Sequence, residues 1–349
     1  MDFYSLRIKG IKKETNDAVS ITFDVPENLT SDFKYTAGQY LTLEATINNE
    51  TIRRAYSIWK APFENEISVL IKKIEGGSFS SYANLELKVG DAINVSNPLG
   101  GFKISSDDEK STTFFAAGSG ITPILSIVKQ QLFDHSSNSA TLFYVNKNTD
   151  STIFMDEIDK LSSNFPNQLN VFHLFTREKS DKNEFSGRIN EAKCAELLEA
   201  GALNINSDSF YICGPEEMIL STKDFLMEHS VEKQKINFEL FTSNEPDEVD
   251  LESHLDEATV HITIDDDEFE FEYVLSASNS LLDAGNETGL DLPFSCKGGV
   301  CCTCKAKIME GSAMMIKNYA LSDEEVAEGY ILTCQSHPTS EKLVISYDE

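Results

Sequence analysis

The sequence predicts a multidomain chain in which an antiparallel β-barrel precedes an α/β domain with a parallel sheet and a small α+β domain. Its length of 349 residues is too great for one typical core and suggests two or three domains. Short alternating runs fill roughly the first hundred residues, buried strands alternate with helices after them, and four cysteines stand near the C-terminus. These three patterns predict the three domains.

Residues 1–106 carry short runs of alternating polar and apolar residues separated by turn residues. Examples are Val19–Val25, Tyr40–Glu44 and Ile67–Ile74. Such runs at short spacing indicate an antiparallel barrel or sandwich, and we assign the segment to a barrel.

Residues 107–242 change to buried strands that alternate with amphipathic helices. The expected strands are Thr112–Ala117, Ala140–Val145, Leu169–Phe175 and Ser209–Cys213, and the expected helices lie near Pro123–Phe133, Phe154–Ser163 and Asn190–Ala200. This order predicts a parallel sheet wound with helices.

Residues 243–257 form a predicted acidic linker. Within it, Glu245–Glu257 holds seven carboxylates, one proline and no lysine or arginine. Such a stretch cannot bury enough apolar surface to fold alone. Residues 258–349 then form the third domain, which is centred on the cysteines.

Four cysteines predict an iron–sulfur site. Cys296, Cys301 and Cys304 follow the C-x4-C-x2-C spacing of a plant-type [2Fe–2S] centre, and Cys334 lies 30 positions further on. Thiolates are soft ligands, and four of them complete two tetrahedral irons bridged by sulfide. Buried structural cysteines and a zinc site are the alternatives, but zinc sites usually pair two C-x2-C units and only one such unit is present.

A flavin site is the next candidate, in the first segment. Arg54, Tyr56 and Ser57 stand in one strand and are expected to project to one face, where they could meet a pyrophosphate, a flavin or ribose, and the isoalloxazine edge. About 20 residues later, Gly77 and Ser80 stand where backbone N–H groups could meet phosphate. Each motif alone is equally compatible with an exposed basic strand or a loose turn, but their order and spacing favour a flavin.

This Arg-x-Tyr-Ser and Gly-x-x-Ser pattern resembles the FAD domain of the ferredoxin–NADP reductase superfamily, and the resemblance covers the whole first segment. It implies that FAD is held by Arg54, Tyr56 and Ser57, that its pyrophosphate is lined by Gly77 and Ser80, and that Ile71 and Lys72 supply backbone contacts.

A glycine turn follows the first strand expected in the α/β domain. Gly118 and Gly120 allow close backbone approach, and the helix N-terminus that follows attracts a pyrophosphate. Pro123 fits the first helical position, with Thr122 as the cap. Pro123 also stands where a third glycine would complete the dinucleotide fingerprint, so this turn alone is a weak signal.

A second turn, made by Cys213, Gly214 and Pro215, ends the last of the four expected strands. Ligands of open α/β sheets bind beyond the carboxyl ends of the strands, which is where both turns fall. A buried free cysteine is usually only a small apolar residue. The same superfamily has a Cys-Gly-Pro turn, however, and the resemblance implies that Cys213 lies beside the nicotinamide as an orienting group.

The end of the α/β domain and the end of its third strand add four candidates. By resemblance, Glu239 assists near the nicotinamide and Phe241 covers the flavin ring; an ordinary final strand is the alternative. Thr176 and Arg177 could bind a 2′-phosphate, as in reductases that carry Ser-Arg at this position. They favour NADPH over NADH, although Arg177 could also be an ordinary surface residue.

The domain order resembles that of reductase components of multicomponent oxygenases, with a β-grasp plant-type ferredoxin domain last. Pro293–Cys304, Asn318–Leu321 and Gly329–Gln335 are similar to the reductase subunits of phenylacetyl-CoA epoxidases. The resemblance implies an electron path from NADPH through FAD and [2Fe–2S] to the di-iron oxygenase subunits, with FAD as the step from two electrons to one. Cys302 departs from this pattern and is expected to be a non-ligand thiol.

Other acceptors and another class of protein remain open. The same chain could serve a ring-hydroxylating dioxygenase, a hybrid-cluster protein, an acyl desaturase or a general ferredoxin. A non-enzymatic redox sensor with flavin and cluster is the alternative from a different class, although complete nucleotide motifs disfavour it.

Charge and composition exclude several partners. The formal net charge of −29 disfavours nucleic acid, which requires a basic face. Acidity could simply keep the protein soluble, or could steer a docking partner. No run approaches the length of a membrane span, no secretory signal is expected, and seven cysteines predict a reducing cytoplasm.

Overall fold

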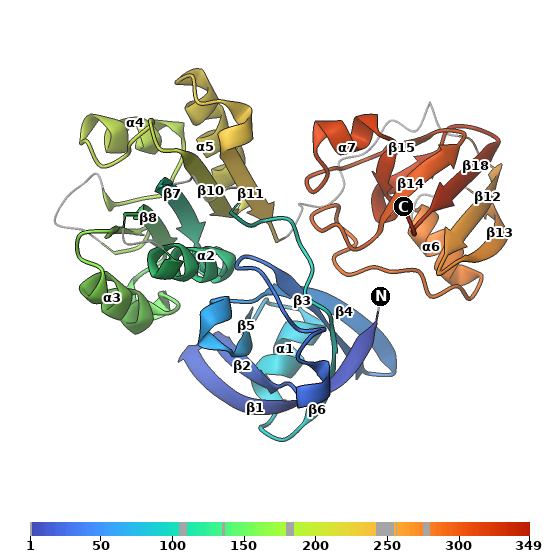
Figure 1. The fold of residues 1–349 in the computed structure, drawn as a ribbon, viewed down its shortest axis with the longest axis horizontal. Coiled ribbons are helices and arrows are strands. Elements are labelled where there is room, and N and C mark those ends of the chain that lie inside the picture. Colours follow the sequence, from blue (N-terminus) through green and yellow to red (C-terminus); the bar gives the residue numbers. More distant parts are fainter. Residues whose placement is uncertain are drawn as a thin grey trace. The chain divides into compact units, whose positions relative to one another are not determined.

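The structure is a computed structural model that describes residues 2–104, 110–134, 137–178, 185–241, 255, 257–274 and 280–349. The chain divides into two compact units, Met1–Leu240 and Phe241–Glu349. Figure 1 shows both. The predicted linker over residues 243–257 lies outside the described residues, except for residues 255 and 257.

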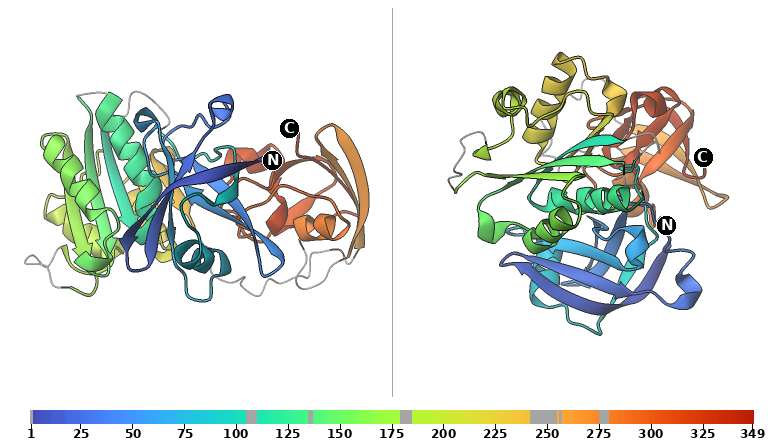
Figure 2. Two further views of the ribbon diagram at one scale, coloured as in Figure 1. Left: turned by 90° about the horizontal axis from the view of Figure 1, so that it is seen from below. Right: turned by 60° about the vertical axis from the view of Figure 1, so that its left-hand side comes forward.

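The first unit begins with a six-stranded antiparallel sheet in the order β4-β3-β6-β1-β2-β5. An isolated bridge between Ile58 and Val69 joins the two edge strands, so the sheet closes into the predicted barrel (Figure 2). Inward side chains such as Leu6 and Ile8 are buried, as the period of a strand requires. The strands are β1 (Phe3–Thr15), β2 (Ala18–Asp24), β3 (Tyr40–Ile47), β4 (Glu50–Ser57), β5 (Ile67–Lys72) and β6 (Ala92–Ser96).

One helix in this barrel was not expected from the sequence. Helix α1 (Ser78–Leu85) follows the Gly76–Gly77 turn and packs on β5, with Phe79 and Ala83 buried. Its segment is rich in serine, asparagine and aromatic residues, which are weak helix formers. Tertiary packing of its apolar face therefore decides its structure.

The second part of the first unit is a five-stranded parallel sheet in the order β11-β10-β7-β8-β9. Helices α2 and α3 cover one face, and α4 and α5 cover the other (Figures 1 and 2). The strands are β7 (Ser111–Ala117), β8 (Ser139–Asn146), β9 (Leu169–Phe175), β10 (Ser209–Gly214) and β11 (Ile236–Leu240). The helices are α2 (Ile121–Asp134), α3 (Met155–Asn164), α4 (Glu191–Glu199) and α5 (Glu216–Glu228).

Central strand β7 shows why this sheet is parallel and covered on both sides. Phe114, Phe115 and Ala116 are consecutive and wholly buried, which is the pattern of a strand with helices on both faces. The strands and helices predicted in this part are confirmed, with ends shifted by one or two residues.

The second unit contains a mixed five-stranded sheet in the order β13-β12-β18-β14-β16, with a separate β15-β17 pair. β12 runs parallel to β18 and antiparallel to β13, and α6 packs against β13 and β17. The strands are β12 (Glu257–Ile264), β13 (Asp267–Val274), β14 (Lys305–Glu310), β15 (Ala313–Met315), β16 (Tyr330–Leu332), β17 (Ser336–Pro338) and β18 (Lys342–Ser346); the helices are α6 (Leu281–Glu287) and α7 (Asp323–Ala327). The predicted fold class, a barrel, a parallel α/β sheet and an α+β unit, is confirmed.

No helix in the described part of the chain has both the length and the apolar character needed to cross a membrane.

Candidate functional site

The order of the parallel sheet reverses between β7 and β10, the first and fourth strands of this part of the chain. Ligands of open α/β sheets bind at such a switch point, outside the carboxyl ends of the strands. β7 ends at Ala117, directly before Gly118, and β10 ends at Gly214. The two turns predicted from the sequence therefore meet at one edge of the sheet.

Glycine allows these two turns to touch. A Cβ atom on Gly120 would lie 2.1 Å from the backbone oxygen of Cys213, and one on Gly214 would lie 2.5 Å from Cε of Met218. Gly118 has a φ of 55°, in the left-handed region that favours glycine. The close backbone approach expected at Gly118 and Gly120 is present.

The start of α2 differs from the prediction. A 3₁₀ turn over Gly118–Gly120 leads into the helix at Ile121, so Thr122 and Pro123 lie inside the first turn. Thr122 is not the cap: its hydroxyl donates to the carbonyl of Ser119 at 2.9 Å. The glycine turn already bends into helical geometry, which moves the helix start forward. Pro123 is tolerated because first-turn N–H groups have no partner within the helix.

Ser57, Cys213 and Glu239 gather beside this turn. Ser57 Oγ at the end of β4 donates to Glu239 Oε2 at 3.2 Å, although 182 positions separate them. Cys213 faces Glu239 in the register of β10 and β11. The structure thus brings together predicted residues of the barrel and of the parallel sheet.

Cys213 is kept as a neutral thiol. It is wholly buried, and burial first and the charge of Glu239 second raise its pKa well above the usual value. A nucleophilic cysteine requires a lowered pKa. The surroundings therefore suit the predicted role, a compact group that orients a ring, and do not suit a nucleophile.

The flavin residues of β4 do not all share one face, so this expectation is wrong. Ser57 points toward Glu239, whereas the ring of Tyr56 packs against Phe79 at 5.7 Å between centroids. Consecutive residues of a strand point to opposite sides, and Ser57 directly follows Tyr56. Arg54 is exposed, and its Nη1 donates to the carbonyl of Arg53 at 2.7 Å.

Ile71 and Lys72 lie at the end of β5, and their surroundings differ. Ile71 is buried, and its carbonyl accepts from Asn84 at 3.0 Å. The resemblance implied only a backbone contact for Lys72. Its side chain, however, reaches the nucleotide turn: its Nζ lies 3.7 Å from where a Cβ atom on Gly118 would be. Sequence reasoning did not assign this ammonium to the nucleotide turn, because β5 and the turn are 46 residues apart and only folding brings them together.

Gly77 and Ser80 build the turn before α1. A Cβ on Gly77 would lie 2.7 Å from Ser80 Oγ, and that hydroxyl accepts from the N–H of Ile74 at 3.1 Å. Gly77 is the N-cap of α1 and has no side chain to cap the helix. The first N–H groups of α1 can therefore bind an anionic group. These N–H groups and the exposed Arg54 guanidinium are suited to bind a pyrophosphate. Together with the Tyr56 ring, which can contact a flavin or ribose, they form a site that fits FAD.

Thr176 and Arg177 lie away from these groups, after β9 at the outer edge of the sheet. Both are exposed, and their N–H groups donate to the carbonyls of Asn146 and Lys147 at 2.9 and 2.8 Å. The adjacent Glu178 carboxylate accepts from the N–H of Thr149 at 2.8 Å. Of the other candidates, Pro215 begins α5 as its N-cap, and Phe241 directly follows β11.

The four predicted cysteines of the second unit lie together. Cys301 Sγ lies 3.1 Å from Cys296 Sγ, Cys296 also contacts Cys334, and Cys334 contacts Cys304. These contacts link all four thiols in one chain. A two-iron centre requires two thiolates on each iron, and four neighbouring cysteines supply that number.

The chemistry of this donor set fits a cluster. The neighbouring Cys296 thiol, together with burial, raises the pKa of Cys301 well above its usual value. Crowded thiols of this kind do not ionise on their own, but iron supplies the positive charge that deprotonates them. The N–H of Gly298 lies 3.4 Å from Cys296 Sγ and can stabilise the thiolate.

Residues outside the ligand set hold the cysteine loop. The N–H of Tyr319 donates to the carbonyl of Gly299 at 3.0 Å, and Gln335 Nε2 donates to the carbonyl of Lys297 at 3.1 Å. Cys302 turns toward the carbonyl of Ala320, 3.6 Å from its Sγ. The predicted non-ligand thiol is therefore half-buried against a different segment from the one that carries the ligands.

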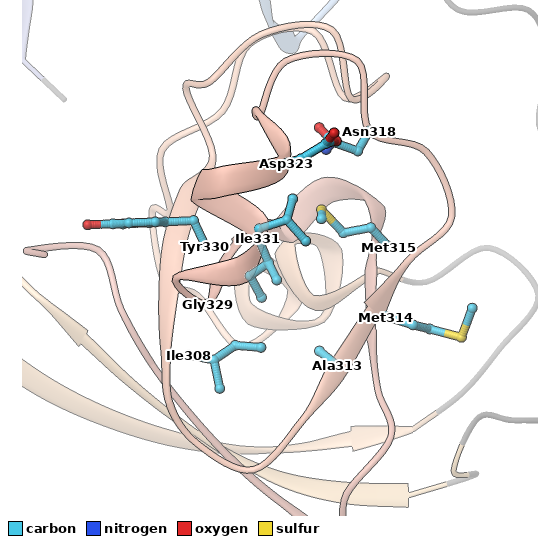
Figure 3. Close-up of a pocket in the computed structure, with 10 residues that line it drawn as sticks. Ile308, Ala313, Met314, Met315, Asn318, Asp323, Gly329, Tyr330 and Ile331 are labelled. Carbon is cyan, nitrogen blue, oxygen red and sulfur yellow. The ribbon is translucent and has the colours of Figure 1, made fainter.

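A pocket of about 500 Å³ opens elsewhere in the second unit, between β14, β15, α7 and β16 (Figure 3). Its lining includes Ile308, Met315 and Ile331 and none of the four cysteines. The N–H of Leu332 lies 3.3 Å from the sulfur of Met315, so this pocket adjoins the segment that leads to Cys334.

Three family models match the chain in order. They are the oxidoreductase FAD-binding domain over residues 5–104, the oxidoreductase NAD-binding domain over 114–224 and the 2Fe-2S iron-sulfur cluster binding domain over 262–339. The matches contain all of the candidate residues described above except Glu239 and Phe241. The chain therefore has FAD-binding, NAD-binding and [2Fe–2S]-binding domains.

Similar proteins span the whole chain. One component of the 1,2-phenylacetyl-CoA epoxidase of Escherichia coli is 36% identical over 99% of this chain and 98% of its own length. The ferredoxin reductase component of 3-ketosteroid-9-alpha-monooxygenase from Rhodococcus rhodochrous is 29% identical over 98% of this chain and 96% of its own. Among solved structures, phthalate dioxygenase reductase has the same fold, with a TM-score of 0.61 at 24% identity over 99% of this chain and 98% of its own.

Two of these relatives are named as reductases of oxygenase systems, and all three align with this chain over nearly their whole length. The chain belongs to this family of flavin and iron–sulfur reductases, which delivers electrons to oxygenase partners.

Proposed function

We propose that this reductase takes electrons from NADPH and delivers them to the di-iron oxygenase subunits of a phenylacetyl-CoA epoxidase. The end-to-end similarity to the epoxidase component of Escherichia coli carries this assignment. When bound, FAD accepts a hydride from the nicotinamide and releases its electrons singly, and the cluster carries one electron at a time. The cytoplasmic location predicted from cysteine usage forms part of the proposal.

The geometry of the first unit supports the proposed flavin and nucleotide residues. Arg54, Tyr56, Ser57 and the α1 N-terminus would hold FAD, with Gly77 and Ser80 shaping the turn. Gly118 and Gly120 would admit the nucleotide pyrophosphate, and the Lys72 ammonium beside Gly118 would neutralise part of its charge.

Ser57, Cys213 and Glu239 would form the wall at which the nicotinamide meets the flavin. The Ser57 hydroxyl is fixed by its bond to Glu239, and the neutral Cys213 thiol fills the space beside it without adding charge. Such packing excludes water and restrains the rings in reacting geometry. Phe241, directly after β11, would cover the flavin ring.

The preference for NADPH rests on Thr176 and Arg177. The Arg177 side chain is exposed, and the neighbouring Glu178 carboxylate accepts hydrogen bonds from the N–H and the hydroxyl of Thr149. The four cysteines whose thiols lie together in the second unit would bind the [2Fe–2S] cluster: Cys296, Cys301, Cys304 and Cys334.

The test is an anaerobic titration of the cofactor-replete protein with NADPH and, separately, with NADH. We expect NADPH to bleach the flavin and to produce the EPR signal of a reduced [2Fe–2S] centre. A tighter response to NADH would overturn the assignment of Thr176 and Arg177 alone. Arg177→Ala should weaken NADPH binding about 10-fold or more and leave NADH binding within about 3-fold.

The acceptor is tested separately, by adding purified oxygenase subunits of phenylacetyl-CoA epoxidase and measuring NADPH-dependent epoxidation. Similarity to 3-ketosteroid-9-alpha-monooxygenase reductase components over nearly the whole chain favours a steroid monooxygenase as the second candidate. Faster turnover with that oxygenase would replace the first assignment.

A further inference from the structure

A group of charged and aromatic side chains joins the barrel to the parallel-sheet part of the first unit. We call it the Trp59 clamp. It consists of Trp59, Lys60 and Glu64 from the segment between β4 and β5, and of Ser126, Lys129, Phe154 and Glu157 from α2 and the start of α3.

The ring of Trp59 lies at the centre of this clamp. It is 8% exposed and stacks on Phe154 from the other side of the junction, with 4.4 Å between centroids. The ammonium groups of Lys60 and Lys129 lie 4.5 and 4.6 Å from the centroid of the ring. Two cations and an aromatic ring thus converge on the one tryptophan of the chain.

Lys129 ties the two parts together by charge. Its side chain is only 4% exposed, and its Nζ lies 3.2 Å from a Glu64 oxygen and 2.7 Å from a Glu157 oxygen. Lys60 Nζ lies 2.8 Å from Glu64. Such ion pairs add little net stability, but loss of the partners would leave the buried Lys129 ammonium without compensation, which is costly.

Two further features fix the same junction. Ser126 Oγ donates to the carbonyl of Lys60 at 2.6 Å, so α2 is bonded directly to the barrel backbone. Phe154 has a φ of 59°, which is uncommon for an aromatic residue, and strain of this kind persists only where the surroundings determine it.

The clamp is attached at both ends to proposed cofactor residues. Trp59 lies two residues after Ser57, and Ser126 and Lys129 lie on α2, which begins directly after the Gly118–Gly120 turn. A helix transmits position rigidly over so few turns. We propose that the Trp59 clamp sets the distance between flavin and nicotinamide, with Lys129 as a positioning residue for hydride transfer. This proposal rests on the flavin and nucleotide placement given above.

The expected effect follows from the geometry of transfer. A displacement of about 1 Å at the reacting atoms can lower a rate by roughly 100-fold, whereas binding of each cofactor depends on contacts within its own part. Disturbing the clamp should therefore slow flavin reduction and leave the nucleotide Kd nearly unchanged.

The experiment compares the cofactor-replete wild-type protein with Lys129→Met, Lys129→Arg and the matched control Lys13→Met, whose exposed side chain lies on β1. Stopped-flow flavin reduction by NADPH gives the limiting rate and the Kd. We expect Lys129→Met to lower the limiting rate about 10- to 100-fold with Kd within about 3-fold, and Lys129→Arg to restore much of it. Lys13→Met should match the wild type.

Fluorescence gives a second readout, independent of activity. Since Trp59 is the sole tryptophan, its emission reports this junction alone, and Lys129→Met should shift it to longer wavelength. Ile8→Val, in the barrel core, controls for stability: it should lower the melting temperature without changing the rate or the emission.

The outcomes separate the two proposals. If wild-type flavin is not reduced by either nucleotide, the cofactor placement is wrong. If wild-type flavin is reduced but Lys129→Met keeps its rate, or Ile8→Val slows equally, the positioning role is wrong. If Lys129→Met does not fold, Ser126→Ala tests the positioning role instead, because it removes the bond to the Lys60 carbonyl. We expect a smaller fall in the limiting rate of flavin reduction, with the Kd for NADPH unchanged.

Discussion

Cys213 occupies the point where the barrel and the parallel sheet meet, and its state is set by its neighbours. The thiol is wholly buried, beside Ala116 of β7 and Glu239 of β11. Burial, followed by the charge of Glu239, raises its pKa well above the usual value of 9.0. The side chain therefore remains neutral wherever the folded protein functions.

This raised pKa predicts a loss of stability at alkaline pH. Because the unfolded thiol ionises near pH 9 and the folded one does not, the stabilisation is complete below about pH 9 and is lost as pH rises above it. Between about pH 7 and pH 10 the wild type should lose about 1.4 kcal/mol more than Cys213→Ala. Denaturant unfolding at several pH values measures this difference, and parallel pH profiles would contradict it.

The same substitution, cysteine to serine, should have opposite effects at the neighbouring positions 301 and 302 of the second unit. Cys301→Ser removes a proposed cluster ligand and should abolish most of the visible absorbance and EPR signal of the cluster. Cys302→Ser should retain both, since Cys302 turns toward Ala320. Iron and sulfide analysis of the two purified proteins gives the comparison. Loss of iron from Cys302→Ser would show that the ligand set is wrong.

Single residues differ in how far the sequence predicts their role. The spacing of Cys296, Cys301 and Cys304 predicts their proximity, because ligands close in sequence share one loop. The bond between Ser57 and Glu239 spans 182 positions and forms only when two sheets pack. For the same reason, neither the clamp at Lys129 nor the approach of Lys72 to Gly118 could be predicted.

The two turns at the switch point are in contact, so a change in one must displace the other. Gly120 brings the end of β7 against the end of β10, since any side chain there would meet the backbone oxygen of Cys213. Backbone cannot move aside as a flexible side chain can, so the whole turn must shift.

Gly120→Ala should therefore weaken nucleotide binding by about 10-fold or more, because both turns move apart. Gly10→Ala is the matched control, since a Cβ on Gly10 meets nothing within 4 Å. The Kd for NADPH, together with the melting temperature, decides the result. A Gly120→Ala protein with wild-type affinity would contradict the proposed role of this contact.

Elements with a strong period were predicted from the sequence, and elements that depend on packing were not. The continuous apolar run in Thr112–Ala117 predicted β7, because a strand of a covered parallel sheet is apolar on both faces. Helix α1 was missed because its serine and asparagine residues favour turns, and only the burial of Phe79 and Ala83 stabilises it. The start of α2 was misplaced because the glycine turn itself becomes helical.

The whole molecule carries a formal charge of −29, which bears on association with a partner. If a basic docking face on the oxygenase is steered by this charge, salt should slow electron delivery. We expect the rate to fall about 10-fold between roughly 20 and 500 mM salt. Reduction of a small uncharged quinone serves as the control and should change little. A rate independent of salt would show that the acidity serves solubility alone.

At this scale the order of the domains and the reductase function were predicted from motifs, whereas the acceptor was expected only from the combined resemblance of three segments of the third domain to one group of reductase subunits. The fold class follows from the change of pattern along the chain, and the family matches confirm it. The acceptor is recognised by a surface of another protein. The individual cofactor-binding motifs therefore specify the superfamily, and the acceptor remains a proposal.

The buried thiol at the switch point also affects how long such an enzyme lasts. A reductase that serves an oxygenase works in air, where reduced flavins and clusters lose electrons to dioxygen and release peroxide. Peroxide oxidises thiolates far faster than thiols. Because burial keeps the Cys213 thiol protonated and shielded from solvent, a sulfur that we propose to lie beside the nicotinamide should resist damage by the protein's own by-product.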